Sequence, residues 1–287
     1  MSPTPAKCSP LRSDSDRWSE LHCGRRTFLS GVAAATIGAW WRIDRWTTEA
    51  AEVPDAPAST ARGILSLRLQ ATDLDAQARF YGEALGFSIG RTKDRLRVQA
   101  GGTEIEFSTA PEGTQPIYHL AWSIPSNLLA SAKVWLAERT PLLVHPDGRD
   151  EFHFRRPQRR AAYFADPAGN ILEVITRDRL GDRQEGPFDR RHLLSVNHAG
   201  LVVDDMTAAI EEIRRGLGLE LRYEPTAHFA QLGDEHRHLV LVTRQRLWLP
   251  ERKVPAEVFA TEVHLDGDQD ARLDLAGYPY RLRIGSS

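Results

Sequence analysis

The chain has 287 residues, a length that corresponds to roughly two average domains. Hydrophobic residues make up 41 % and charged residues 26 %, a globular balance that excludes a wholly disordered chain, a collagen or a polytopic membrane protein. The 37 basic and 39 acidic residues leave a net charge of −2, which argues against a dedicated nucleic-acid-binding protein. Both cysteines, Cys8 and Cys23, lie near the N-terminus, so the rest of the chain has no disulfide or catalytic thiol.

Residues 1–60 are predicted to be an export signal followed by a linker. The pair Arg25-Arg26 precedes a short apolar stretch that runs from Phe28 to Trp41. This order is typical of a secretory signal, and the arginine pair resembles that of a twin-arginine signal. A short buried helix after two chance arginines is the alternative. We therefore expect the export machinery to recognise the chain and deliver it to the periplasm or the exterior; without a clear cleavage site, an uncleaved membrane anchor stays open.

The segment after the linker begins with a βαβββ pattern. Residues 64–70 alternate apolar and polar side chains, which is the period of a half-buried strand. Asp73 stands where a helix N-cap belongs, an amphipathic helix is predicted over 74–85, and Gly86 ends it. Three further strands are predicted at 87–91, 95–100 and 103–108.

The same pattern recurs along the chain. Asp205 and Gly218 are as far apart as Asp73 and Gly86, and they bound a predicted helix of the same length. We call the separation between Asp73 and Asp205 the repeat offset. Another copy lies between these two helices, with a strand at 117–124, a helix at 126–138, and a hairpin of strands at 160–165 and 171–176.

A fourth copy after residue 255 has a strand at 259–265 and a hairpin over 273–284, with no room for a helix. The sequence therefore predicts an α+β protein of tandem βαβββ modules in which the fourth module is incomplete. We place two modules in a first domain at 61–180 and the others in a truncated second domain at 190–287.

Three motifs stand out in the first two modules. They are Asp73-Leu74 leading to Phe80-Tyr81 and Leu85-Gly86-Phe87, then Tyr118-His119-Leu120-Ala121-Trp122, then Tyr163-Phe164-Ala165-Asp166-Pro167-Ala168-Gly169-Asn170-Ile171-Leu172-Glu173. Together they resemble the vicinal oxygen chelate superfamily, which contains glyoxalases, bleomycin-resistance proteins and extradiol dioxygenases. The resemblance implies two modules packed side by side, whose curved sheets enclose a cleft that often holds a divalent metal.

Alternation of side chains predicts which residues face this cleft. In the strand at 117–124 the even-numbered positions are bulky and apolar, and His119 and Ser123 point the other way. In the strand at 64–70 the three leucines at positions 65, 67 and 69 are expected in the core, and Ser66 and Arg68 toward the cleft. Glu173 lies in an apolar strand, where its charge needs a metal, an arginine or a proton to compensate it.

The resemblance implies a metal site at these positions. His119 and Glu173 occupy the ligand positions of the second module, and Glu106 fits a carboxylate ligand of the first. Ser66 stands where the family usually has His or Gln, and serine is a poor ligand, so the site has one histidine and two carboxylates at best. Such a site suits Fe²⁺, Mn²⁺, Ni²⁺ or Zn²⁺.

Plainer interpretations stay open for each residue. His119 could hydrogen-bond within a polar core, Glu106 could face water, and Glu173 could pair with an arginine. His198 and His238 follow Ser66 and Glu106, respectively, by the repeat offset. Because the fourth module lacks a matching carboxylate, we expect a structural role for both histidines.

Two other segments have two interpretations each. Four arginines at 155, 156, 159 and 160 could hold an anionic substrate, although a solvated loop is the interpretation that we favour. The segment 246–250, which contains Trp248, is either a hydrophobic plug or a partner surface.

The predicted function is a metal-dependent isomerase, lyase or ring-cleaving dioxygenase for a small substrate with two adjacent oxygens. The metal would act as a Lewis acid, Glu106 or Glu173 would be the base, and Ser66, Arg68 and Ser123 are candidate substrate contacts. Ser66 favours the alternative, a metal-free binding protein of the bleomycin-resistance type; a third class would use the second half for interactions. We expect the ligand site in residues 64–176, with residues 194–287 supporting it or mediating association, for example as a homodimer.

Overall fold

The computed structural model describes residues 63–155, 158–177 and 181–286. The predicted export signal, its arginine pair and both cysteines lie outside the described residues. Within the part that is described, no helix combines the length and the apolar character needed to cross a membrane.

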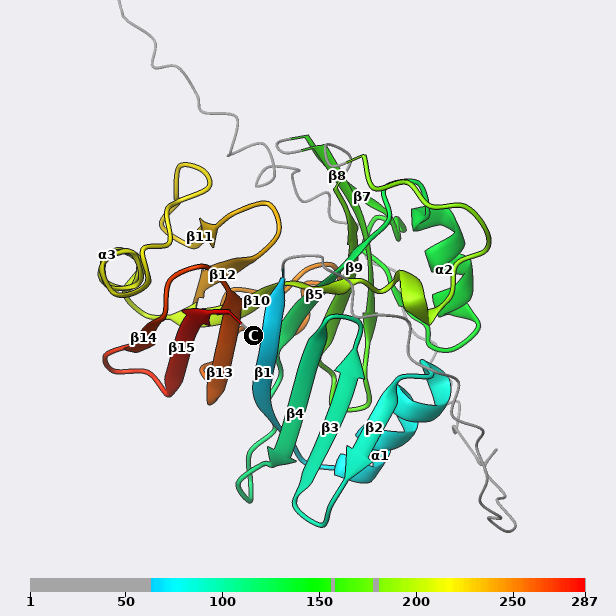
Figure 1. The fold of residues 1–287 in the computed structure, drawn as a ribbon, viewed down its shortest axis with the longest axis horizontal. Coiled ribbons are helices and arrows are strands. Elements are labelled where there is room, and N and C mark those ends of the chain that lie inside the picture. Colours follow the sequence, from blue (N-terminus) through cyan, green and yellow to red (C-terminus); the bar gives the residue numbers. More distant parts are fainter. Residues whose placement is uncertain (1–62, 156–157, 178–180, 287) are drawn as a thin grey trace, which may run out of the picture. The chain divides into compact units, whose positions relative to one another are not determined.

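The described chain consists of four successive modules (Figure 1). The first contains β1 (Ile64–Ala71), α1 (Leu74–Ala78), the π-helical segment η1 (Arg79–Ala84), β2 (Ser88–Arg91), β3 (Arg95–Ala100) and β4 (Thr103–Thr109). The second contains β5 (His119–Ile124), α2 (Leu129–Ala137), β6 (Leu142–Leu143), β7 (Phe152–Arg155), β8 (Gln158–Ala165) and β9 (Ile171–Thr176). After the 3₁₀ turn η3 (Arg190–His192), the third contains β10 (Ser195–Val203), α3 (Met206–Leu217), β11 (Phe229–Gly233) and β12 (His238–Thr243). The fourth contains β13 (Thr261–Asp266), β14 (Ala271–Asp274) and β15 (Tyr280–Gly285), which confirms the predicted α+β fold of tandem modules with an incomplete last one.

The strands pair the modules in a nested order. β1 lies antiparallel to β13, so the first module joins the fourth, and β5 lies antiparallel to β10, so the second joins the third. Inside each of the first two modules the first strand pairs in parallel with the last, β1 with β4 and β5 with β9. This pairing differs from the expected one, in which the first and second modules share a cleft. Strands from both sides of the predicted boundary at 180–190 therefore pair with each other.

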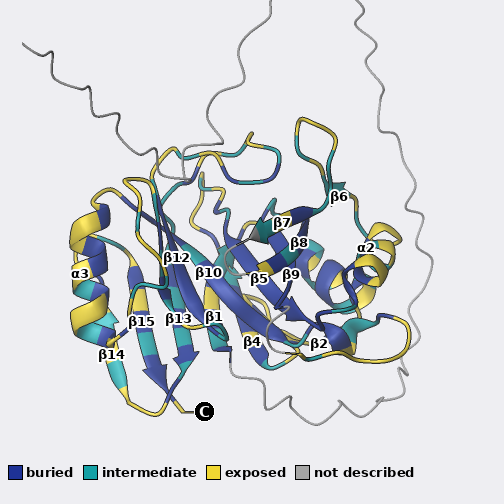
Figure 2. Cartoon of the chain, turned by 90° about the horizontal axis from the view of Figure 1, so that it is seen from above, coloured by how far each residue is buried: buried dark blue, intermediate teal, exposed yellow. Residues whose placement is uncertain are grey.

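The ends and the buried face of helix α3, which packs on the outside of the sheet, follow from its sequence. Asp205 caps its N-terminus by accepting a hydrogen bond from the backbone of Ala208 at 2.9 Å. Gly218 ends it in the left-handed conformation, at φ 65°, which glycine adopts without strain. Its buried residues recur at helical spacing and face the sheet, and its exposed residues form the outer face visible in Figure 2.

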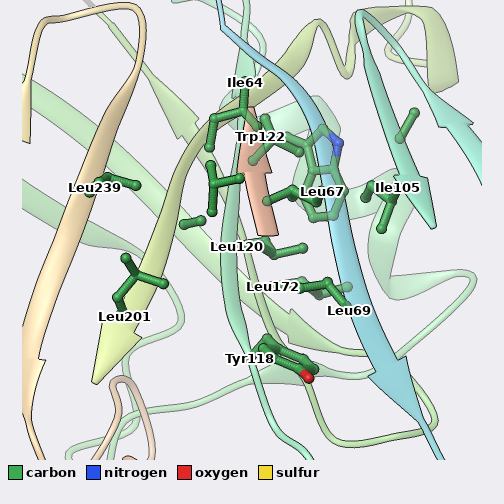
Figure 3. Close-up of a cluster of buried hydrophobic side chains, with 14 of the residues drawn as sticks. Ile64, Leu67, Leu69, Ile105, Tyr118, Leu120, Trp122, Leu172, Leu201 and Leu239 are labelled. Atoms are coloured by element: carbon green, nitrogen blue, oxygen red, sulfur yellow. The ribbon is translucent and has the colours of Figure 1, made fainter. Parts of the chain in front are cut away.

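The two faces of β5 divide as alternation predicts. Leu120 and Trp122 belong to a large apolar core that also takes in β1, β9 and β10, and Figure 3 shows these side chains meeting. Ala121 belongs to a second, smaller apolar cluster on the other face. On β1, Leu67 and Leu69 are buried as expected, but Ile64 is buried in place of Leu65. The cause is a shift of register between Ile64 and Ser66 against β13.

Asp166 connects the first module to the second. Its carboxylate accepts hydrogen bonds from Gln77 Nε2 at 2.8 Å and from the Tyr81 hydroxyl at 3.0 Å, both of which lie in the first module. It also accepts from the Asn170 side chain at 2.7 Å. Asp166 is 5 % exposed, so these partners replace water. The Asp-Pro-Ala-Gly-Asn turn therefore has a structural role at a junction between modules.

Candidate metal centre

Three buried side chains with metal-ligating atoms meet on the adjoining strands β9, β5 and β10. They are Glu173, His119 and His198, and none is more than 7 % exposed. Nε2 of His119 lies 3.3 Å from Nε2 of His198 and 3.5 Å from Oε2 of Glu173. The remaining separation, between Nε2 of His198 and Oε2 of Glu173, is 3.6 Å. We call this group the His-Glu-His cluster.

The register of the three strands produces this convergence. Ala121 on β5 pairs with Glu173 on β9 and with His198 on β10, so the three residues form one row across the sheet. His119 lies two positions before Ala121 and therefore on the same face. Because Ala121 has only a methyl group, the larger side chains on either side can approach each other.

Hydrogen bonds fix the ring nitrogen that each histidine presents to the cluster. Nδ1 of His119 lies 3.0 Å from the backbone carbonyl of Ile171, which only accepts, so this nitrogen holds the proton. Nδ1 of His198 faces Oδ1 of Asn197 at 3.2 Å. The amide nitrogen of Asn197 donates to two backbone carbonyls, at 2.8 and 3.0 Å, so its oxygen is turned toward His198. Both Nε2 atoms thus present lone pairs, as metal-ligating histidines do.

Burial sets the charge of the cluster. The pKa of His119 is lowered to about 4, mainly by burial and next by the neighbouring His198, whose effect is larger than the opposing effect of Glu173. Burial, with Arg159 and Arg222, also lowers the pKa of His198. Burial raises the pKa of Glu173, against the opposing effects of His119, Arg159 and a hydrogen bond from Tyr163. Two neutral imidazoles and one buried carboxylate form a group whose charge a cation would offset.

The three ligand atoms suit a divalent ion. Bonds of about 2.1 Å at tetrahedral angles place ligand atoms about 3.4 Å apart, and the three separations here lie between 3.3 and 3.6 Å. Two imidazoles and one carboxylate are the donor set of non-haem iron oxygenases and of one class of catalytic zinc sites. The residues present therefore fit a metal.

A cavity of about 380 Å³ lies next to the His-Glu-His cluster. Trp248 forms part of its wall, with its ring centroid 5.2 Å from that of His119. A Cβ at Gly200 of β10 would lie 2.8 Å from the Trp248 ring, so the glycine allows this close approach. Of the two interpretations of segment 246–250, the position of Trp248 fits the hydrophobic plug. The other rings of the wall belong to Phe154, Tyr163, Tyr223 and Phe229.

Glu106, which the sequence suggested as a metal ligand, is not brought to the His-Glu-His cluster. It lies on β4, where it accepts hydrogen bonds from Arg95 at 2.5 Å and Arg97 at 3.0 Å, with Arg68 3.8 Å away. Burial alone would raise the pKa of Glu106, but these arginines outweigh it and lower the pKa. The placement of Glu106 follows from the strand pairing. β4 pairs with β1, and β1 pairs with β13 of the fourth module. Arginines therefore compensate the Glu106 charge.

The three candidate substrate contacts also lie elsewhere. Ser66 and Arg68 line a separate cavity between β1, β13 and β15, and Ser66 is paired with His264 there. Ser123 is fully buried on β5, where it pairs with Ser195 of β10. None of these three candidates is among the residues that line the cavity at the His-Glu-His cluster.

His198 is the cluster residue that sequence reasoning missed. The repeat offset from Ser66 marked it as the equivalent position of the third module, which was the available signal. His238 lies behind it, with ring centroids 4.6 Å apart, and is contacted by Arg222 at 2.7 Å. The geometry thus corrects two expectations: the cluster draws on both halves of the chain, and His198 presents a ligand atom.

Comparisons with known proteins bear on the fold. No protein-family model matches the sequence, and no curated protein matches it. Among solved structures, a proposed dioxygenase from Bacillus subtilis is 14 % identical over 79 % of this chain and 86 % of that one, with a TM-score of 0.50. Glyoxalase I from Zea mays is 15 % identical over 78 % of this chain and 92 % of that one, with a TM-score of 0.47. The dioxygenase match shows a common fold, in agreement with the glyoxalase-like fold implied by the sequence motifs.

Proposed function

We propose that this protein is a metal-dependent enzyme of the glyoxalase or extradiol dioxygenase type, acting on a small substrate with two adjacent oxygens. The convergence of His119, His198 and Glu173 at the wall of a cavity supports this proposal. Their donor set suits both a ring-cleaving dioxygenase with Fe²⁺ and an isomerase or lyase with Mn²⁺, Ni²⁺ or Zn²⁺. Ser66, which favoured a metal-free binding protein, lies in a different cavity and does not weaken this site.

The proposed chemistry divides between the ion and the chain. When bound, the ion would supply Lewis acidity toward the adjacent substrate oxygens. His119 and His198 would hold it through Nε2, because their Nδ1 atoms are already hydrogen-bonded. Glu173 is the third ligand and, among the described residues of the cavity wall, the only carboxylate, so it is also the proposed proton acceptor. Trp248 and the other rings would exclude water from the substrate.

Purified protein is expected to contain about one divalent ion per chain, and His119→Ala is expected to contain none. The substitution removes one of three ligands while leaving the apolar core in place, so the fold should survive. Elemental analysis after mild dialysis measures the metal, and circular dichroism monitors the fold. His153→Ala is the control, because this histidine is 67 % exposed and lies outside the His-Glu-His cluster. Equal metal content in wild type and His119→Ala contradicts the site, and absence of metal from both favours the metal-free binding protein.

We also propose that the chain is exported through its arginine pair. The proposal rests on the sequence of residues 1–60, where Arg25-Arg26 precedes the apolar stretch. Changing both arginines to lysine is expected to leave the precursor inside the cell, as measured by fractionation and immunoblotting. The double change Arg12→Lys with Arg17→Lys in the same segment is the control and should be exported normally. Unchanged export of the Arg25-Arg26 variant rejects the twin-arginine interpretation.

A further inference from the structure

Three residues in the wall of the cavity at the His-Glu-His cluster have buried polar atoms with no hydrogen-bond partner among the described residues. The atoms are Nε of Arg159, Nε1 of Trp248 and Oε1 of Gln231. Arg159 is only 4 % exposed and Trp248 only 8 %. Buried polar atoms are nearly always hydrogen-bonded in folded proteins, because leaving them unpaired costs free energy. These atoms, two donors and one acceptor, belong to three residues of the cavity wall.

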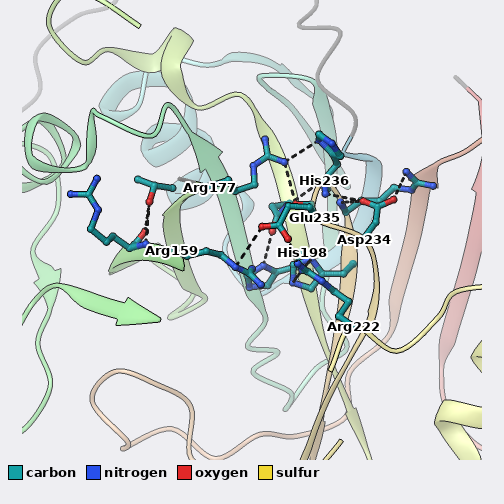
Figure 4. Close-up of polar contacts among 12 residues, drawn as sticks. Arg159, Arg177, His198, Arg222, Asp234, Glu235 and His236 are labelled. Atoms are coloured by element: carbon teal, nitrogen blue, oxygen red, sulfur yellow. Dashed lines mark hydrogen bonds and ion pairs between the residues drawn. The ribbon is translucent and has the colours of Figure 1, made fainter. Parts of the chain in front are cut away.

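Arg159 is a buried cation whose carboxylate partner is shared. The nearest carboxylate oxygen, Oε1 of Glu235, lies 3.9 Å from its Nε, beyond hydrogen-bond distance. The other oxygen of Glu235 lies 2.5 Å from a guanidinium nitrogen of Arg222. Figure 4 shows Arg159, Arg222 and Glu235 gathered beside His198. One carboxylate therefore serves two guanidinium groups, and its close contact is with Arg222.

Arg246 adds a second cation to the same wall. It lies on the segment that contains Trp248, and its guanidinium carbon is 4.9 Å from the centre of the Phe229 ring. Burial and the neighbouring Arg252 lower its pKa, and no described carboxylate acts on it. The stacking on Phe229 positions the charge over the cavity without neutralising it.

Both arginines line the same cavity as the three residues of the His-Glu-His cluster. Against these two cations the described cavity wall has one carboxylate, Glu173. Such a wall attracts an anion, and a carboxylate matches the planar fork of an arginine. The aromatic side chains of the wall can pack against the planar, apolar part of a ligand.

We infer that the cavity binds a planar aromatic ligand with a carboxylate group, and that Arg159 and Arg246 form the subsite for this carboxylate. That the ligand is a substrate, with its adjacent oxygens toward the His-Glu-His cluster, rests on the proposed function. The carboxylate subsite consists of side chains of this chain alone and does not require a metal.

Benzoate and its neutral analogue benzamide test the subsite by isothermal titration calorimetry at low ionic strength. The full chain is titrated after chelator treatment and again after loading with Zn²⁺, and the metal content of each sample is measured. Benzoate is expected to bind the metal-free wild type at least tenfold more tightly than benzamide does. Arg246→Gln should remove most of this difference and leave benzamide binding unchanged. Arg159→Gln should act in the same direction, with its thermal stability recorded because this residue is buried.

Arg215→Gln is the matched control, since it removes the same charge from an exposed position on α3. Equal affinities of benzoate and benzamide for the wild type, or an equal loss of benzoate binding in Arg246→Gln and Arg215→Gln, overturns the inference. The outcomes separate it from the proposed function. Benzoate selectivity in a protein that holds no metal as purified and takes up no Zn²⁺ supports the subsite and rejects the metal-dependent enzyme. Zn²⁺ uptake without benzoate selectivity overturns the subsite and supports the metal site.

Discussion

His198→Ala is expected to lose its metal as completely as His119→Ala does. The Nε2 atom of His198 lies 3.3 Å from that of His119 and 3.6 Å from the Glu173 carboxylate, so its removal leaves two ligands. Loss of an outer partner of a metal ligand already lowers affinity by about 10- to 100-fold, and loss of the ligand itself should exceed that range. Competition for Zn²⁺ against a chromophoric chelator measures the affinity, and elemental analysis measures the occupancy.

Two substitutions in the other half of the sheet serve as controls. They are Glu106→Gln and His264→Ala. His264 lines the cavity between β1, β13 and β15, and Glu106, which Arg95 and Arg97 hold, lines another cavity between the first and fourth modules. Both variants should keep wild-type metal content. If Glu106→Gln loses the metal while His198→Ala retains it, the metal centre lies between the first and second modules, as the sequence suggested.

Asp166→Ala is expected to destabilise the protein severely without altering the metal ligands. The change would leave Gln77, Tyr81 and Asn170 with buried donors and no acceptor. Each such unpaired group costs about 1–3 kcal/mol, so we expect a loss of about 4 kcal/mol in the free energy of unfolding. For a domain of this size that corresponds to a fall in melting temperature of roughly 10 °C. Urea denaturation and calorimetry measure these quantities.

Asp94→Ala is the control for this experiment, because Asp94 is an exposed aspartate in a turn of the same module as Gln77. Its melting temperature should match that of the wild type. A similarly small effect of Asp166→Ala would show that the junction between the first and second modules does not depend on this carboxylate.

The modules could be predicted from the sequence because their signals are local. Asp205 and Gly218 bound α3 as expected, and the ranges of β3 and β9 agree with the predicted strands. The pairing of modules could not be predicted in this way. Alternation tells which face of β1 or β5 is apolar, but either pairing of modules buries the same faces. The partner strand depends on contacts between residues far apart in the chain.

The His-Glu-His cluster, too, could be predicted from the sequence only in part. His119 and Glu173 share one face of two adjoining strands of a single module, and the structure brings their side chains within 3.5 Å. Glu106 was expected in the metal site and His198 in a structural role, and the structure reverses the two. Their placement depends on which module packs against the second one, and this is not visible in a local pattern. The ion pair of Glu106 with Arg97 also depends on a neighbouring strand, because the two residues face each other between β4 and β3. A local pattern can therefore identify candidate ligands before it can group them.

The nested pairing of the modules also affects the order in which the chain can fold during synthesis. β5 and β10 are close in sequence, so the inner pair of modules can assemble while the ribosome is still translating. β1 must wait for β13, whose Val263 pairs with Leu67. Until then one edge of β1 has unpaired backbone groups, and such an edge recruits strands of other molecules. The fourth module, which is synthesised last, thus covers the exposed edge of β1. Premature termination after β12 would leave that edge unpaired in an aggregation-prone chain that already contains all three residues of the metal centre.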